Sequence, residues 1–156
     1  HSDIGRLVAA IDERFGDAHL SISLPALRAD SFSVGLAEAG CDVALVSRTQ
    51  SKLEEVATDV EATGRKALVV PTDLTDVGQI TSMTEKVHQA FGQINILVNN
   101  AGIMRTPFGK TADGFELQFG TNHLGHFALT GLLLEHILGT LLARVVTVSS
   151  GGIISA

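Results

Sequence analysis

The fold of this chain can be worked out from Ile94-Asn95-Ile96-Leu97-Val98-Asn99-Asn100-Ala101-Gly102, an apolar run that ends in two amides and a glycine. A continuous apolar run bounded by polar turn residues is typical of a buried parallel strand. The side chains of Asn99 and Asn100 can join neighbouring loops, and Gly102 allows the backbone to pass close to a ligand. In doubly wound α/β sheets, ligands bind at such carboxyl ends of strands. An ordinary strand-to-loop exit without a ligand is the alternative.

Composition limits the classes of protein to which the chain can belong. It has 156 residues, 45% of them hydrophobic and 18% charged, which predicts one globular domain. The net charge of −6 without a basic cluster argues against nucleic acid and against an anionic membrane surface as partners. No apolar run reaches the length of a membrane span and no signal-peptide pattern is present, so a cytoplasmic location is expected. Cys41 is the only cysteine, which excludes a cysteine metal cluster.

Apolar periodicity and turn residues make strands and helices alternate along the chain. Strands are expected at residues 19–24, 42–47, 67–70, 94–99 and 144–149, and helices at residues 3–15, 30–40, 51–63, 76–91 and 111–138. This alternation predicts a single Rossmann-like domain over residues 1–156, with a doubly wound parallel sheet in the order 3-2-1-4-5 and helices on both faces. A ligand crevice is expected between the strands at residues 19–24 and 94–99.

Several short motifs follow one another along the chain in the order and spacing of a known family. They are Leu36-Ala37-Glu38-Ala39-Gly40, Ser47-Arg48, Asp73-Leu74, Asn99-Asn100-Ala101-Gly102, Asn122-His123-Leu124-Gly125-His126-Phe127 and Val145-Val146-Thr147-Val148-Ser149-Ser150. From about Leu36 to Ser150, roughly three quarters of its length, the chain resembles the short-chain dehydrogenase/reductase family.

The resemblance implies a nucleotide site. Arg48 matches a basic residue that in many members pairs with the 2′-phosphate of NADP, and a guanidinium can bind a phosphate through two hydrogen bonds. Asp73 matches the acid that bonds the adenine ring, while Asn99, Ala101 and Gly102 match the motif that stabilises the sheet and lines the adenosine site. The alternatives are a solvated surface arginine for Arg48 and a helix-capping carboxylate for Asp73.

The resemblance also implies part of a catalytic site. Asn122 matches an asparagine that holds a water in a proton relay, and Ser150 matches the serine that hydrogen-bonds the substrate carbonyl. A hydroxyl placed there can stabilise negative charge that develops on the oxygen during hydride transfer. His123 and His126 have a spacing that could hold a metal on a helix. No third ligand is evident, so we expect packing or solvent-facing histidines and no metal.

Two departures from the family pattern limit the expected chemistry. The family uses a tyrosine as catalytic base with a lysine four residues further on, and this chain contains no tyrosine. The family's turn Thr-Gly-x-x-x-Gly-x-Gly is also absent, because Ser23, Leu27 and Ala29 stand about where its glycines belong. Those glycines let backbone N–H groups approach the pyrophosphate, and Asp30 would compete with it for the helix N-terminus, although Arg28 could partly compensate. NADP binding is therefore expected to be weak or lost.

The segment that replaces the glycine-rich turn has a resemblance of its own. About residues 3–35 resemble a stretch of radical S-adenosylmethionine proteins that carry a cobalamin-binding domain, which suggests a chimera or a fusion remnant joined to residues 36–156. The cluster-binding cysteines of those proteins are absent, so no iron–sulfur cluster is expected.

Three functional hypotheses follow. The favoured one is a folded α/β domain whose chemistry is incomplete, because function depends on sites rather than folds. The second is a weak NADP(H)-binding module, and the third is an oxidoreductase for a carbonyl or alcohol whose site another chain completes. Apolar residues in the helix at 111–138 and an open sheet edge also predict a homo-oligomer.

Overall fold

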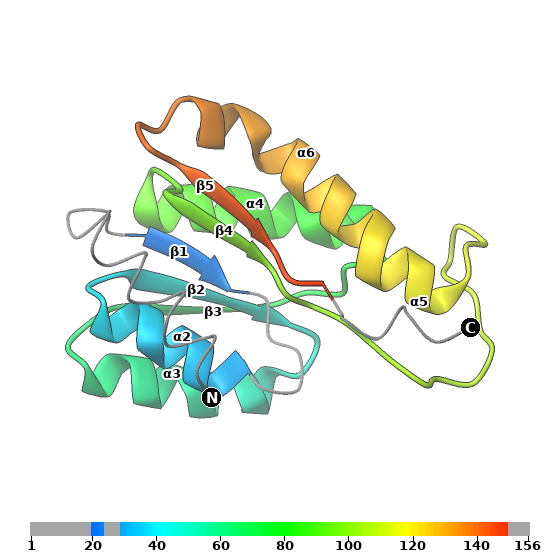
Figure 1. The fold of residues 1–156 in the computed structure, drawn as a ribbon, viewed down its shortest axis with the longest axis horizontal. Helices are drawn as coiled ribbons and strands as arrows, with labels where there is room; N and C mark the ends of the chain where they lie inside the picture. Colours follow the sequence, from blue (N-terminus) through cyan, green and yellow to red (C-terminus); the bar gives the residue numbers. More distant parts are fainter. Residues whose placement is uncertain (1–19, 24–28, 150–156) are drawn as a thin grey trace.

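The structure is a computed structural model that describes residues 20–23 and 29–149, with the backbone alone for residues 20–23 and 29–31. Its strands form one parallel sheet in the order β3-β2-β1-β4-β5 (Figure 1). The strands are β1 Leu20–Ser23, β2 Asp42–Ser47, β3 Ala67–Pro71, β4 Ile96–Asn99 and β5 Arg144–Thr147. The predicted α/β class, strand order and strand direction are therefore confirmed.

Helices cover both faces of this sheet. In Figure 1, α2 and α3 lie below the sheet, and α4 and α6 lie above it. The helical segments are α2 Ala29–Glu38, α3 Gln50–Ala62, α4 Val77–Phe91, α5 Leu117–Phe119, the π-helical turn η1 Gly120–Leu124, and α6 Gly125–Leu138. The general right-handedness of parallel crossovers accounts for this arrangement, with α2 and α3 on one face and α4 and α6 on the other.

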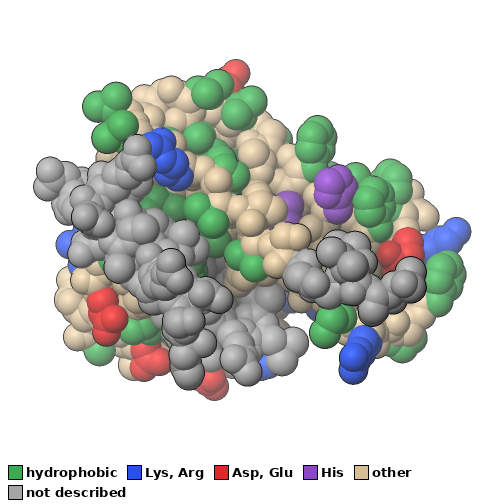
Figure 2. Space-filling model, viewed as in Figure 1, with side chains coloured by type: hydrophobic (Ala, Val, Ile, Leu, Met, Phe, Trp, Pro, Cys, Tyr) green, Lys and Arg blue, Asp and Glu red, His purple; other side chains and the backbone are tan. Residues whose placement is uncertain are grey.

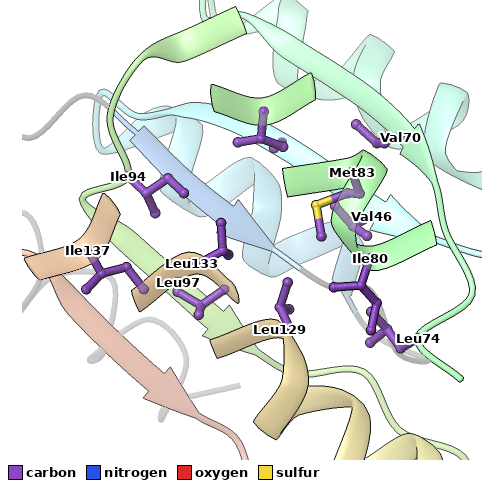
Figure 3. Close-up of a cluster of buried hydrophobic side chains, with 12 residues drawn as sticks. Val46, Val70, Leu74, Ile80, Met83, Ile94, Leu97, Leu129, Leu133 and Ile137 are labelled. Carbon is purple, nitrogen blue, oxygen red and sulfur yellow. The ribbon is translucent and has the colours of Figure 1, made fainter. Parts of the chain in front are cut away.

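Strand β4 supplies side chains to the hydrophobic cores on both faces of the sheet. Ile96 and Val98 pack in the core beneath α2 and α3, whereas Leu97 packs in the core beneath α4 and α6. Figure 3 shows Leu97 in this second core together with Leu129 and Leu133 of α6. Burial on both faces explains why the sequence of β4 is continuously apolar rather than alternating.

The expected helix at residues 111–138 is wrong in its first part. Lys110 and Glu116 instead form an isolated antiparallel bridge, and Gly114 makes the turn between them with a φ of +86°. Glu116 then begins the helix, because its carboxylate accepts hydrogen bonds from the backbone N–H groups of Gln118 (2.9 Å) and Phe119 (2.8 Å). These bonds also lower the pKa of the Glu116 carboxyl below its ordinary value.

Smaller differences from the expected elements occur at strand ends and at the N-terminus. Strand β3 runs one residue past the expected 67–70 and includes Pro71. It is an edge strand, where a proline costs no ladder hydrogen bond. The expected helix at residues 3–15 lies outside the described residues. Among the helices that the structure describes, none is long and apolar enough to cross a membrane.

Large apolar side chains are exposed near both ends of α6. Phe127 in its first turn and Leu138 in its last are each 76% exposed, and Phe108 and Leu141 are more than 80% exposed. Figure 2 shows hydrophobic side chains on this side of the molecule.

Candidate functional site

A cavity opens at the carboxyl ends of β2, β3 and β4, where parallel α/β sheets bind ligands. Four of the residues expected at the nucleotide site line it: Arg48, Asp73, Ala101 and Gly102. The other lining residues are Val46, Ser47, Thr72, Leu74, Ile103 and Thr121. The sequence analysis did not name Ile103 and Thr121, although Ile103 follows Gly102 and Thr121, in η1, precedes Asn122.

Asp73 is held in place by its own loop. The backbone N–H and the hydroxyl of Thr75 donate to Asp73 Oδ1 at 2.9 and 2.8 Å, and the Asp73 N–H donates to Gln79 Oε1 at 2.9 Å. The alternative role of Asp73 as a helix cap is wrong, because Asp76 caps α4 by accepting from Gln79 N–H at 3.1 Å. That bond lowers the pKa of the Asp76 carboxyl. In the described part of the chain, Asp73 Oδ2 has no partner and can accept a hydrogen bond from a ligand.

Arg48 stands between the end of β2 and the start of α3. Its side chain is exposed, and within residues 32–149 no carboxylate lies in ion-pair range of it. By contrast, Arg65 pairs with Asp42 at 2.8 Å at the opposite end of the sheet. Thr49, the N-cap residue of α3, makes no side-chain hydrogen bond to the helix N-terminus. The guanidinium and the uncapped helix N-terminus together favour an anion at this edge of the cavity.

Asn99 has a structural position rather than a place in the cavity lining. Its side chain is 3% exposed, and its Nδ2 donates to Thr130 Oγ1 of α6 at 3.0 Å and to Thr147 Oγ1 of β5 at 3.5 Å. Asn99 therefore joins β4 to β5 and α6. Its buried Oδ1 has no partner among the residues that the structure describes.

Asn122 bonds the loop after β4, although it does not itself line the cavity. Its Oδ1 accepts from the Ile103 N–H and its Nδ2 donates to the Ile103 carbonyl oxygen, each at 2.8 Å. These two bonds use one lone pair of Oδ1 and one N–H of Nδ2, and a second acceptor site and a second donor remain on the amide. The side chain positions the Ala101–Ile103 segment, which lines the cavity.

Replacing Asn122 with aspartate is expected to loosen this loop. The carboxylate keeps the acceptor for the Ile103 N–H but sets an oxygen against the Ile103 carbonyl, so the unfolding free energy should fall by about 1 kcal/mol. Urea denaturation followed by circular dichroism measures the change. Gln89→Glu makes the same amide-to-carboxylate change at an exposed site of α4 and should have a smaller effect. Equal effects of the two substitutions would contradict this role of Asn122.

The π-helical turn η1 brings the start of α6 against the loop after β3. Gly125 N–H bonds the Gly120 carbonyl, which widens the helix by one residue. A Cβ on Gly125 would lie only 2.8 Å from the Leu74 carbonyl oxygen. Since Leu74 follows Asp73, this close contact fixes one wall of the cavity. The glycines at positions 120 and 125 are the only signal of the turn in the sequence.

The two histidines of the Asn122–Phe127 motif lie in different surroundings. His126 is 7% exposed, and burial lowers the pKa of its imidazole, against the opposing effect of a hydrogen bond to the Asn122 backbone. The His123 ring is exposed and stacks on Phe119 with ring centroids 5.2 Å apart. The structure therefore does not direct the two rings toward one point.

Several expected site residues lie beyond the described part. Ser150, Leu27 and Arg28 fall outside it, and for Ser23, Ala29 and Asp30 only the backbone is described. The crevice was predicted beside β1, at the switch point of the strand order, where residues 24–28 follow β1. Those residues lie outside the described part, so only the residues that follow β2, β3 and β4 can be placed around it.

Comparisons with known proteins match most of the chain. A family model described as short chain dehydrogenase matches residues 30–153. Retinol dehydrogenase 12 of Mus musculus is 43% identical over 117 residues, and retinol dehydrogenase 11 of Homo sapiens is 42% identical over the same length. A crystal structure of a short-chain type dehydrogenase/reductase from Mycobacterium marinum matches with a TM-score of 0.76 and 26% identity, over 92% of this chain and 62% of that one.

The match to the curated relatives is partial in length. The aligned residues make up 74% of this chain but 37% of each of the two retinol dehydrogenases. The family model begins at residue 30, so the resemblance of about residues 3–35 to cobalamin-binding radical S-adenosylmethionine proteins stays a prediction.

Proposed function

The chain belongs to the short-chain dehydrogenase family, and we propose that it forms the NADP(H)-binding part of an oxidoreductase for an alcohol or carbonyl substrate. The observation that carries the proposal is the convergence of Arg48, Asp73 and Gly102 on one cavity at the strand ends. The Arg48 cation suits a phosphate, and the Asp73 carboxylate is an acceptor for the adenine amino group of a nucleotide. The open backbone at Gly102 leaves room for the ribose.

The described residues fit such a nucleotide in three places. Asp73 Oδ2 has a free acceptor for an adenine amino group, because Thr75 occupies only Oδ1. Arg48 would bind a 2′-phosphate, which favours NADP(H) over NAD(H). Gly102 leaves space beside Asn122 Oδ1, since even an added Cβ would lie 3.7 Å from that atom. When bound, the nicotinamide ring supplies or accepts the hydride.

The proton chemistry of the reaction is less complete in this polypeptide. It contains no tyrosine, and the family resemblance assigns the proton transfer to a tyrosine assisted by a lysine. Asn122 and Ser150 are the catalytic positions that it carries. We therefore expect the 156-residue polypeptide to bind nucleotide without turning over substrate, unless another chain or segment supplies the base. A substrate of apolar character is suggested by the retinol dehydrogenases among its relatives.

Replacing Arg48 with alanine tests the cofactor proposal. Loss of a charge-assisted contact to the 2′-phosphate should weaken NADPH binding by about tenfold while NADH binding changes little. Isothermal calorimetry with both nucleotides measures the difference. Arg65→Ala is the matched control, because Arg65 pairs with Asp42 far from the cavity, and it should leave both affinities unchanged.

Other outcomes of the same titration favour the remaining hypotheses. Saturable NADPH binding that Arg48→Ala leaves intact would contradict the assignment of Arg48. Absence of binding at about millimolar NADPH would favour a folded domain without its ligand. Self-association through the exposed α6 residues or the free edge of β5 is a further proposal, which light scattering checks.

A further inference from the structure

Two histidines meet at the end of the molecule opposite the cavity. His88 stands in the last turn of α4 and His136 in the last turn of α6, and their ring centroids are 4.3 Å apart with the planes tilted by 32°. Both helices run against the strands, so their C-termini lie at the amino edge of the sheet, away from Arg48 and Asp73 (Figure 1).

The surroundings of this pair suit a cation. The last turn of each helix presents backbone carbonyls whose partial negative charge favours positive ligands. In the described part of the chain, no hydrogen bond involves a ring nitrogen of either imidazole, so their lone pairs are available. Imidazole nitrogen is a preferred ligand of Zn²⁺ and its neighbours in the first transition row.

We propose that His88 and His136 together bind one Zn²⁺-like transition-metal ion that links the C-terminal ends of α4 and α6. Two imidazole nitrogens bound to one tetrahedral ion stand roughly 3.3 Å apart, given metal–nitrogen bonds of about 2.0–2.1 Å. The ring centroids lie 4.3 Å apart, so the rings must turn until one nitrogen of each faces the ion, and His88, being exposed, has room to turn.

The number of protein ligands sets the strength and role of this site. No cluster of three or more metal-ligating side chains occurs within residues 32–149, so water would complete the coordination shell. A two-histidine site binds more weakly than a closed structural zinc site with four protein ligands. Its effect would be structural. An ion that binds the folded state but not the unfolded state stabilises the fold, here at the α4–α6 contact, by mass action. This inference is independent of the proposed nucleotide function.

Zinc titration of histidine-to-phenylalanine variants tests the proposal. Phenylalanine keeps an aromatic ring in the stack and removes the nitrogen ligands, so the packing of α4 on α6 is retained. We expect the wild-type chain to bind Zn²⁺ in calorimetry, and His88→Phe or His136→Phe to weaken that binding by at least about tenfold. Zn²⁺ should also raise the thermal midpoint of the wild-type chain but not that of the double variant.

His123→Phe is the matched control. His123 is exposed and stacks on Phe119 rather than on another histidine, so this variant should bind Zn²⁺ like the wild-type chain. Circular dichroism of each variant confirms that it is folded. The proposal is overturned if the wild-type chain binds no Zn²⁺, or if the double variant binds it as tightly as the wild-type chain does. It is equally overturned if His123→Phe loses as much affinity as His88→Phe.

Discussion

Replacing Leu97 with alanine is expected to lower the free energy of unfolding by about 2–5 kcal/mol. Leu97 is fully buried in β4, which pairs with β1 on one side and β5 on the other. Its side chain fills the core beneath α4 and α6 (Figure 3), among other buried residues. The lost transfer energy and the unfilled cavity therefore add to each other. Urea unfolding followed by circular dichroism measures the change.

Leu138→Ala is the matched control for this prediction. Leu138 lies at the end of α6 with 76% of its surface exposed, so its removal should change the unfolding free energy by less than about 0.5 kcal/mol. If both variants lost the same stability, Leu97 would not have the central position that the structure gives it. A smaller urea dependence of the unfolding free energy in Leu97→Ala would point instead to a change in the unfolded or native compactness.

The sheet could be predicted from the sequence because its signals are local. The apolar run at residues 94–99 is bounded by Gly92 and Asn100. Glycines or capping residues mark the ends of several of the expected helices. Asp76, for example, was expected to start a helix, and it caps α4 through Gln79 N–H. Strand order then follows from the right-handed crossover rule, which leaves few arrangements for alternating strands and helices.

The region between β4 and α6 could not be predicted in the same way. Periodic apolar residues suggested a helix from Thr111, but Lys110 pairs with Glu116 across a local turn within the same segment. Leu117 N–H bonds the Gly109 carbonyl at 2.9 Å, and Gly109 sits against the Leu117 side chain. Asp113-Gly114 is a turn signal that would have corrected the prediction, since glycine readily adopts the positive φ required there.

The motifs named several residues that share one cavity in the structure, but they did not give the geometry of that cavity. Family motifs named Arg48, Asp73, Ala101 and Gly102, and the fold places them around one cavity. The motif match alone could not show that the Asn122 side chain is committed to Ile103. Such bonds join segments that are far apart in the sequence, and spacing within a motif carries no information about them.

The walls of the cavity depend on tertiary contacts that tie it to the rest of the fold. Asn122 holds the loop after β4, and Gly125 contacts the loop after β3 through Leu74. Both residues belong to the segment around the π-helical turn, so one short segment positions two of the three strand-end loops. A π turn is energetically unfavourable and is commonly retained where it serves a site. Disturbing this segment should therefore affect both stability and ligand binding.

Replacing Gly125 with alanine tests this dependence directly. The new Cβ would lie 2.8 Å from the Leu74 carbonyl oxygen and 3.1 Å from the Leu74 Cβ, so backbone must move. Overpacking of this kind should lower the unfolding free energy by about 1–3 kcal/mol. Because Leu74 follows Asp73 and lines the cavity, NADPH binding should weaken as well if the cavity is the cofactor site. Urea denaturation and calorimetry measure the two effects separately.

Gly131→Ala on the same helix separates the contact from the general effect of alanine. Nothing lies within 4 Å of a Cβ at Gly131, so alanine there should stabilise α6 by about 0.5–1 kcal/mol through its higher helix propensity. Opposite signs for the two substitutions would therefore locate the loss at the Leu74 contact. If Gly125→Ala were instead as stabilising as Gly131→Ala, the start of α6 could not lie against the loop after β3, and the cavity wall would have to be built differently.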